Sequence, residues 1–152
     1  MRPYDGRSDA SDSSGASDRS DREKGGMRLA EVVEALEAEV IVGGDRLEME
    51  VPAGGASDMV SDLVFFGRPG MVLLTGLTKS SVVRAAQVAD VSAIVFVRGK
   101  RPEREAIELA GEIGLPLLLT AHSMYDSCGR LYVRGLPGVI PASQGAIPGD
   151  SV

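Results

Sequence analysis

Apolar residues near the start of the folded part of the chain recur every three or four positions, a spacing that predicts a helix. In the segment MRLAEVVEALEAEV, glutamates fill the opposite face, and the apolar face consists of Leu29, Val32, Val33, Leu36 and Val40. A short strand is expected at residues 40–42, after which Gly43-Gly44-Asp45 breaks the chain. The next segment, RLEMEV, alternates apolar and charged residues, which is the period of a half-buried strand.

The second half of the chain alternates between short apolar runs and helical patterns. The runs in MVLLTG, SAIVFVRG and LPLLL are typical of strands buried on both faces. We expect one helix to open at Thr78, a second to run from Pro102 to Gly114, and a last one to be capped by Thr120. Because strands and helices alternate, βαβ units are indicated. The sequence therefore predicts the α/β class, with a single three-layer-like domain built on a mainly parallel sheet.

The stretch VPAGGASDMVSDLV places two glycines, Gly54 and Gly55, between a strand-like and a helix-like segment. Such glycines either present backbone N–H groups to a phosphate or turn the chain. Ser57 or Asp58 is expected to cap the following helix, and Asp58 and Asp62 would place two carboxylates where they repel a phosphate. We therefore interpret Gly54, Gly55, Ser57 and Asp58 as a structural strand-to-helix turn.

Composition excludes several classes of protein. The chain has 152 residues and a net charge of −6, an acidic balance that argues against general nucleic-acid binding. One cysteine and one histidine allow no intrachain disulfide and make a conventional zinc site improbable, so we expect no metal and no cofactor. No apolar run is long enough to cross a bilayer and no secretory signal is visible, so the expected location is the cytoplasm, without a membrane partner.

Both ends of the chain differ from its middle. Residues 1–26 are rich in Ser, Asp, Gly and Arg and lack apolar periodicity, so we expect disorder. Two interpretations stay open for this segment: a real flexible tail, or a sequence upstream of a true translation start at Met27. Residues 136–152 are rich in Pro, Gly and Ser and predict a short ordered return followed by a frayed end. The folded unit is then expected at residues 27–135.

Basic and hydroxyl-bearing residues follow three of the predicted strands. In an open parallel sheet, ligands bind beyond the carboxyl ends of the strands, where residues 75–79, 98–101 and 120–122 should meet. TGLTKSS lacks the glycines of a true phosphate-binding loop, so what remains is a helix N-terminus beside a lysine and two hydroxyls. The candidate ligand-binding residues are Thr78, Lys79, Ser80, Arg98, Lys100, Arg101 and His122. The competing interpretations are an ordinary capped helix and a solvated basic loop.

No convincing catalytic set is present in the sequence. His122 has the reference pKa of a general base, and Asp126 lies one helical turn later. A nucleophile is lacking, because Cys128 would face another direction on the helix and is more simply a small buried residue. We therefore expect no catalytic residue and no enzyme activity.

Several stretches of the chain together resemble the DRTGG domain. This family is similar to the N-terminal domain of HPr kinase and also occurs inside certain phosphotransacetylases and CBS-containing pyrophosphatases. The resemblance rests on VPAGGASDMVSDLV, GMVLLTG, AIVFVRGKRPEREAIELAGEIGLPLLLT and GRLY. The chain departs from the family pattern at Ala53, where the name of the family implies threonine before the glycine pair.

The resemblance implies an accessory or regulatory module with the fold of the HPr kinase N-terminal domain and no established catalytic residue. It implies self-association, as a homodimer or other homo-oligomer, and a partner protein such as a histidine-kinase-like ATPase or a hydrogenase-related protein. Phe65, Phe66 and Tyr132 are candidate interface residues, with placement in the core as the competing interpretation. The alternative function is a small-molecule sensor that binds a nucleotide or another phosphorylated metabolite at the basic edge of the sheet.

Overall fold

A five-stranded sheet with the order β2-β7-β6-β5-β4 forms the middle layer of the computed structural model, which describes residues 26–139. Its strands are β2 (Glu39–Val42), β4 (Gly54–Ala56), β5 (Val72–Thr75), β6 (Ala93–Phe96) and β7 (Leu117–Leu119). β4, β5, β6 and β7 are parallel, and β2 pairs antiparallel with β7 at the edge. The expected α/β class and mainly parallel sheet are confirmed.

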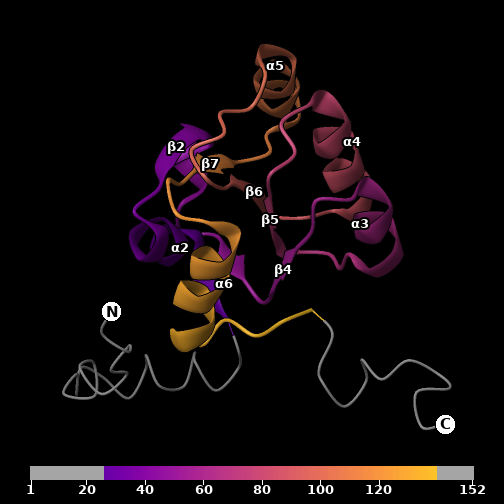
Figure 1. Ribbon diagram of the computed structural model, residues 1–152. Helices are drawn as coiled ribbons and strands as arrows, with labels where there is room; N and C mark the ends of the chain where they lie inside the picture. Colours follow the sequence, from indigo (N-terminus) through magenta and orange to yellow (C-terminus); the bar gives the residue numbers. More distant parts are fainter. Residues whose placement is uncertain (1–25, 140–152) are drawn as a thin grey trace, which may run out of the picture.

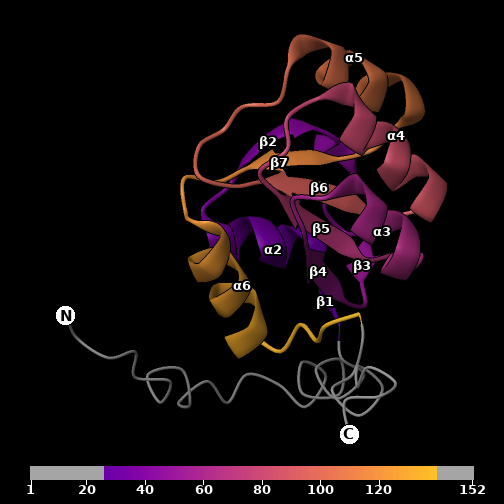
Figure 2. The same cartoon turned by 45° about the vertical axis from the view of Figure 1, so that its right-hand side comes forward.

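Helices cover both faces of this sheet. One face carries α3 (Val60–Phe66), α4 (Ser80–Ala89) and α5 (Arg104–Ile113), and the other carries α2 (Leu29–Leu36) and α6 (Met124–Val133) (Figures 1 and 2). Side chains alternate along the central strands, because successive residues of a strand point to opposite faces. Leu73, Ile94 and Phe96 accordingly pack with the first helix layer. Val72, Leu74 and Val95 pack with the second, which makes three layers with two cores.

The segment predicted as a strand at residues 46–51 is mostly not one. A 3-10 turn, η2 (Gly44–Arg46), is followed by a short strand β3 (Glu50–Val51), which pairs with β1 (Met27–Arg28). The backbone between η2 and β3 accepts hydrogen bonds from the start of α2. Leu29 N–H donates to Met49 O and Ala30 N–H donates to Leu47 O, each at 2.8 Å. These carbonyls satisfy N–H groups in the first turn of α2, which have no partner within the helix.

The interpretation of Gly54 and Gly55 as a turn is wrong, because both lie in the edge strand β4 and pair with β5. Close packing explains the glycines instead. A Cβ atom on Gly54 would lie 2.9 Å from Leu136 Cδ2, and one on Gly55 would lie 2.9 Å from Met71 Cε. Neither glycine has the positive φ that a left-handed turn requires.

Ser57 and Asp58 form the connection to α3 without capping it in the expected manner. The N-cap of α3 is Met59, which has no side-chain cap bond. Ser57 Oγ accepts from Met59 N–H at 3.0 Å and donates to Asp62 Oδ2 at 2.9 Å. Asp58 reaches across to the loop after β5 instead. The prediction that Ser57 or Asp58 caps α3 is therefore wrong.

The other helix ends follow the sequence more closely. Gly114 ends α5 with φ of 74°, as expected, but α5 begins at Arg104 with Glu103 as its N-cap, so Pro102 precedes the helix and is not its first residue. α4 has Lys79 at its N-cap, one residue after Thr78. Thr120 does not cap α6. That place belongs to Ser123, whose side chain accepts from Asp126 N–H, while Thr120 is buried at the end of β7.

Chain beyond residue 135 adds to the fold. Leu136 and Val139 are buried, and Gly54 N–H donates to Pro137 O while Val139 N–H donates to Gly54 O. Residues 136–139 therefore line the outer edge of β4. The expectations for residues 1–25 and 140–152 lie outside the described residues. Within residues 26–139, no helix is long and apolar enough to cross a membrane.

Candidate functional site

The loops that follow β5, β6 and β7 meet at one edge of the sheet, where their strands end. Arg98 N–H donates to His122 O and Gly99 N–H donates to Thr120 O, both at 2.8 Å. Glu103 N–H donates to Thr78 O at 2.9 Å, which joins the β5 loop to the start of α5. The backbone therefore holds the three sequence-predicted loops together. Their side chains, however, divide into two groups.

The first group surrounds the end of β5. Asp58 Oδ1 accepts a hydrogen bond from Gly76 N–H at 2.6 Å. A Cβ atom on Gly76 would lie 2.6 Å from Arg98 Nη2 and 3.2 Å from Asp58 Oδ1. Arg98 adopts the left-handed conformation with φ of 61°, uncommon for a residue other than glycine. The turn after β6 thus folds the Arg98 guanidinium back over the Gly76 backbone.

Free donors and positive charge gather at this group. Among residues 26–139, Arg98, Lys79 and Lys100 have no acidic side chain within 4.0 Å. α4 begins at Ser80, next to Lys79, with no acidic residue in its first turn and no side-chain cap on its N–H groups. Thr78 and Ser80 are half-buried on either side of Lys79. The arrangement offers an anion two kinds of attraction, cationic side chains and a helix N-terminus.

Arg101 belongs to the second group, on the β2 side of the sheet. Its guanidinium donates to both carboxylate oxygens of Glu39, at 3.0 and 3.4 Å. This hydrogen bond, and the positive charge with it, lowers the pKa of Glu39 below the ordinary value. Because Arg101 already has a bidentate acidic partner, it is not available to a ligand in this arrangement.

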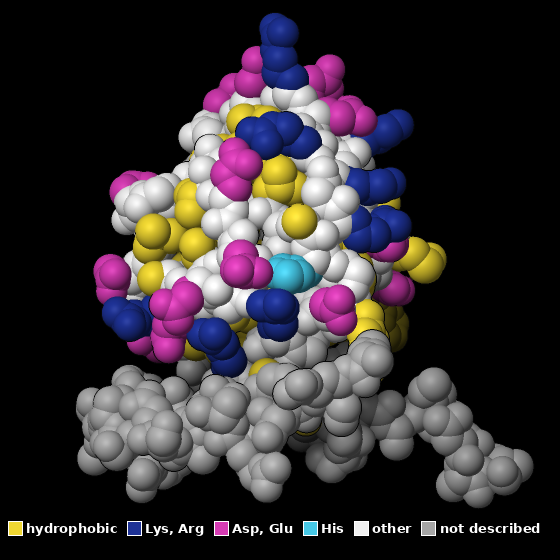
Figure 3. Space-filling model, turned by 60° about the vertical axis from the view of Figure 1, so that its left-hand side comes forward, with side chains coloured by type: hydrophobic (Ala, Val, Ile, Leu, Met, Phe, Trp, Pro, Cys, Tyr) yellow, Lys and Arg dark blue, Asp and Glu magenta, His cyan; other side chains and the backbone are white. Residues whose placement is uncertain are grey.

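His122 also belongs to the second group. Its Nε2 lies 2.9 Å from Glu37 Oε1, and Arg130 Nη1 lies 3.9 Å from the same oxygen. The hydrogen bond to His122 and, after it, the charge of Arg130 lower the pKa of Glu37. The space-filling view shows the single histidine side chain with acidic and basic groups around it (Figure 3). Glu37 and Glu39 could not be assigned to this group from the sequence, because they lie 85 and 62 residues from their partners.

The carboxylate that contacts His122 is that of Glu37 and not that of Asp126, which the sequence suggested. His122 bonds to Glu37, and the backbone of Asp126 bonds to Ser123. Burial raises the pKa of the Cys128 thiol, which disfavours the reactive thiolate. Within residues 26–139, there is no group of three or more His, Cys, Asp or Glu side chains that could hold a metal ion.

Large apolar side chains lie exposed on two helical surfaces. On α3 and the neighbouring α4 these are Phe65, 91% exposed, and Val64, Val88 and Met59. We call these four residues the α3–α4 face. On α6 they are Tyr125, Tyr132 and Val133. Phe66, the other phenylalanine considered for an interface, packs against the core instead.

Comparison with known proteins agrees with this architecture. The chain aligns with the crystal structure of the CBS and DRTGG domains of the regulatory region of Clostridium perfringens pyrophosphatase, complexed with its activator diadenosine tetraphosphate. The TM-score is 0.62 at 21% sequence identity, and the alignment covers 87% of this chain. It covers 56% of the clostridial chain, so this protein spans about half of that regulatory region. At this identity, the similarity is one of fold.

The family assignment comes from the sequence itself. No curated protein matches the chain. The family model of the DRTGG domain, in contrast, matches residues 31–132, which run from within α2 to within α6 and include the candidate edge of the sheet. The chain belongs to the DRTGG domain family.

Proposed function

We propose that this protein is a non-catalytic regulatory module that acts by self-association and by binding a partner protein. The α3–α4 face is the observation that carries the proposal. Exposed apolar residues that gather on adjacent elements are typical of protein interfaces, whereas single ones are normal on any surface. An absence of enzyme activity fits the hydrogen bond that occupies His122 Nε2 and the raised pKa of the Cys128 thiol.

Phe65 is the expected anchor of this face. Its side chain is 91% exposed, so nearly all of its surface is available for burial against another molecule. Burying a phenylalanine side chain contributes about 1.5–3 kcal/mol. Aromatic anchors with smaller apolar neighbours are the usual composition of the centre of an interface. The resemblance stated above suggests the kind of partner, a histidine-kinase-like ATPase or a hydrogenase-related protein.

The self-association half of the proposal is tested by sedimentation velocity on the full chain. Phe65→Ser should raise the dissociation constant of the homodimer by about a hundredfold or more, because a symmetric dimer loses the burial of two phenylalanine side chains. Tyr125→Ser is the matched control, because Tyr125 is 87% exposed but lies on α6. A wild-type protein that stays monomeric at high concentration, or an equal loss with both variants, would contradict the assignment to this face.

A second candidate function is a sensor for a nucleotide or another phosphorylated metabolite. Its supporting observation is the Arg98 guanidinium, which lies over Gly76, three residues before Lys79 and the start of α4, and has no ion-pair partner among the described residues. That the clostridial regulatory region binds a nucleotide activator supports the same choice of ligand. In this second candidate function, the phosphate would contact only the first group, the residues around the end of β5.

Calorimetry with a panel of nucleotides distinguishes this candidate. Lys79→Ala and Arg98→Ala should abolish a saturable, salt-sensitive heat. Arg101→Ala, whose guanidinium is held by Glu39, should leave most of it. A ligand at about 100 times its dissociation constant should stabilise the fold by about 2.7 kcal/mol, visible as a rise in Tm. No heat and no thermal shift with any nucleotide would remove the candidate.

A further inference from the structure

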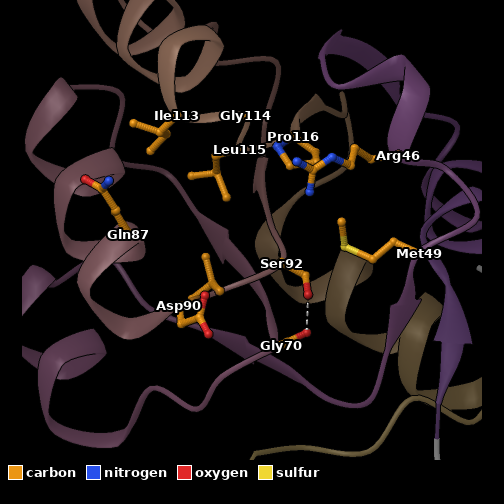
Figure 4. Close-up of a pocket in the computed structure, with 11 residues that line it drawn as sticks. Arg46, Met49, Gly70, Gln87, Asp90, Ser92, Ile113, Gly114, Leu115 and Pro116 are labelled. Atoms are coloured by element: carbon orange, nitrogen blue, oxygen red, sulfur yellow. Dashed lines mark hydrogen bonds between the residues drawn. The ribbon is translucent and has the colours of Figure 1, made fainter.

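A pocket of about 310 Å³ opens at the other edge of the sheet, where the parallel strands begin. Its walls come from the η2 turn and from the segments that precede β5, β6 and β7 (Figure 4). This places it away from the loops of the candidate anion site, which follow the strands. The volume is at the lower end of the range for small-molecule sites, so it suits a small ligand.

Local backbone contacts hold the walls of the pocket in place. Gly43, with φ of 92°, lies so close to Pro116 that a Cβ atom there would be 2.8 Å from its Cα. Gly70 N–H donates to Asp90 O at 2.8 Å, and Ser92 Oγ donates to Gly70 O at 2.7 Å. The close-up shows the latter bond at the floor (Figure 4). A pocket with fixed walls binds without a cost for ordering them.

Two opposite charges line this pocket on facing sides. Arg46 enters from the η2 turn, and Asp90 lies across from it at the end of α4 (Figure 4). Neither side chain has a charged partner within 4.0 Å among residues 26–139. They therefore do not neutralise each other, and the space between them is bordered by the aliphatic side chains of Leu115, Ile113 and Val91.

A structural role accounts for Arg46 but not for Asp90. Arg46 Nη2 lies 3.2 Å from the Cβ position of Gly114, at the C-terminus of α5, where the helix dipole favours a cation. Asp90 is the C-cap of α4, in the left-handed conformation with φ of 59°. A carboxylate there faces the negative end of its own helix, and asparagine or glycine would suit the position better. Asp90 thus adds negative charge where the fold alone disfavours it.

We propose that this pocket binds a small zwitterion, an α-amino acid with an aliphatic side chain. The Arg46 guanidinium binds the carboxylate in a bidentate manner, and Asp90, with the negative end of α4, binds the ammonium group. The aliphatic wall of Leu115, Ile113 and Val91 takes the side chain. A nucleotide or phosphate ester is disfavoured, because Asp90 and two helix C-termini repel a multiply charged anion. The inference is independent of the function proposed above.

The test is NMR titration of the full chain with leucine, isoleucine, valine and methionine. Isovalerate and isobutylamine serve as probes that carry one charge each. We expect saturable shifts of the Gly70 and Gly114 amides with an amino acid, and binding at least about tenfold weaker for either single-charge probe. Arg46→Gln and Asp90→Asn should each weaken binding by about tenfold or more.

Two features of the experiment distinguish a loss of affinity from a defect in folding. Asparagine tolerates the left-handed conformation of residue 90, so Asp90→Asn should keep the wild-type spectrum away from the pocket. Arg84→Gln, on the exposed side of α4 and outside the pocket, should leave the affinity unchanged. The proposal is overturned if no amino acid gives saturable shifts, if the single-charge probes bind equally well, or if both pocket variants keep wild-type affinity.

Discussion

Removing one buried hydroxyl, that of Thr120, should destabilise the protein more than removing a methyl group at the same place. Thr120 is 1% exposed. Its hydroxyl donates to Leu36 O at 2.7 Å and accepts from His122 N–H at 3.2 Å. Leu36 is the last residue of α2, and its carbonyl has no partner within the helix. One side chain therefore joins the end of α2 to the loop after β7.

Thr120→Val keeps the shape of the side chain and deletes both hydrogen bonds. A buried carbonyl left without a donor costs about 1–3 kcal/mol, which for a domain of this size lowers Tm by roughly 5–15 °C. Thr120→Ser keeps the hydroxyl and loses one methyl group, at a cost of about 1 kcal/mol.

Urea unfolding of the full chain, followed by far-ultraviolet circular dichroism, separates these two effects. The expected order of stability is wild type, then Thr120→Ser, then Thr120→Val. A Thr120→Val protein as stable as the wild type, or more stable than Thr120→Ser, would refute the assignment of the hydroxyl to the Leu36 carbonyl.

Three further predictions concern single groups. The hydrogen bond to His122 lowers the pKa of Glu37 below its ordinary value, so the contribution of this hydrogen bond to stability is present above the unfolded pKa and lost as pH falls through the lower folded pKa. Glu37→Gln should therefore make the free energy of unfolding fall less steeply when it is measured from neutral to low pH. Because burial raises the pKa of the Cys128 thiol, iodoacetamide should label it more slowly in the native protein than in urea, and equal rates would contradict this. Gly55→Ala, with a Cβ 2.9 Å from Met71 Cε, should cost no more than about 1 kcal/mol in urea unfolding, because the end of the flexible methionine side chain can move, and a larger loss would contradict this.

The sequence predicts this fold well where the signal is local. The helix that ends at Gly114 and the strands buried on both faces follow from periodicity and from residues next to each other in the chain. The strand position of Gly54 and Gly55 could not be predicted from the local pattern, because the side chains that pack against them, Leu136 and Met71, approach β4 from other parts of the chain.

The site was harder to predict than the fold for the same reason. Basic residues after the strands are visible in the sequence, but whether each of them is free to bind a ligand depends on acidic partners far away in the chain. Arg101 is paired with Glu39 while Arg98 is not, although only three positions separate the two arginines. Nothing in the local pattern distinguishes them, because the antiparallel edge strand that carries Glu39 is placed by tertiary packing.

We propose above that the α3–α4 face is the contact surface of a regulatory module. Amide nitrogen–proton NMR spectra of the full chain, recorded over a series of increasing protein concentrations, can locate that surface. We predict progressive shifts or broadening that gather at residues 59–66 and around Val88, where the exposed side chains lie. Spectra that do not change with concentration, or changes confined to α6, would contradict the claim.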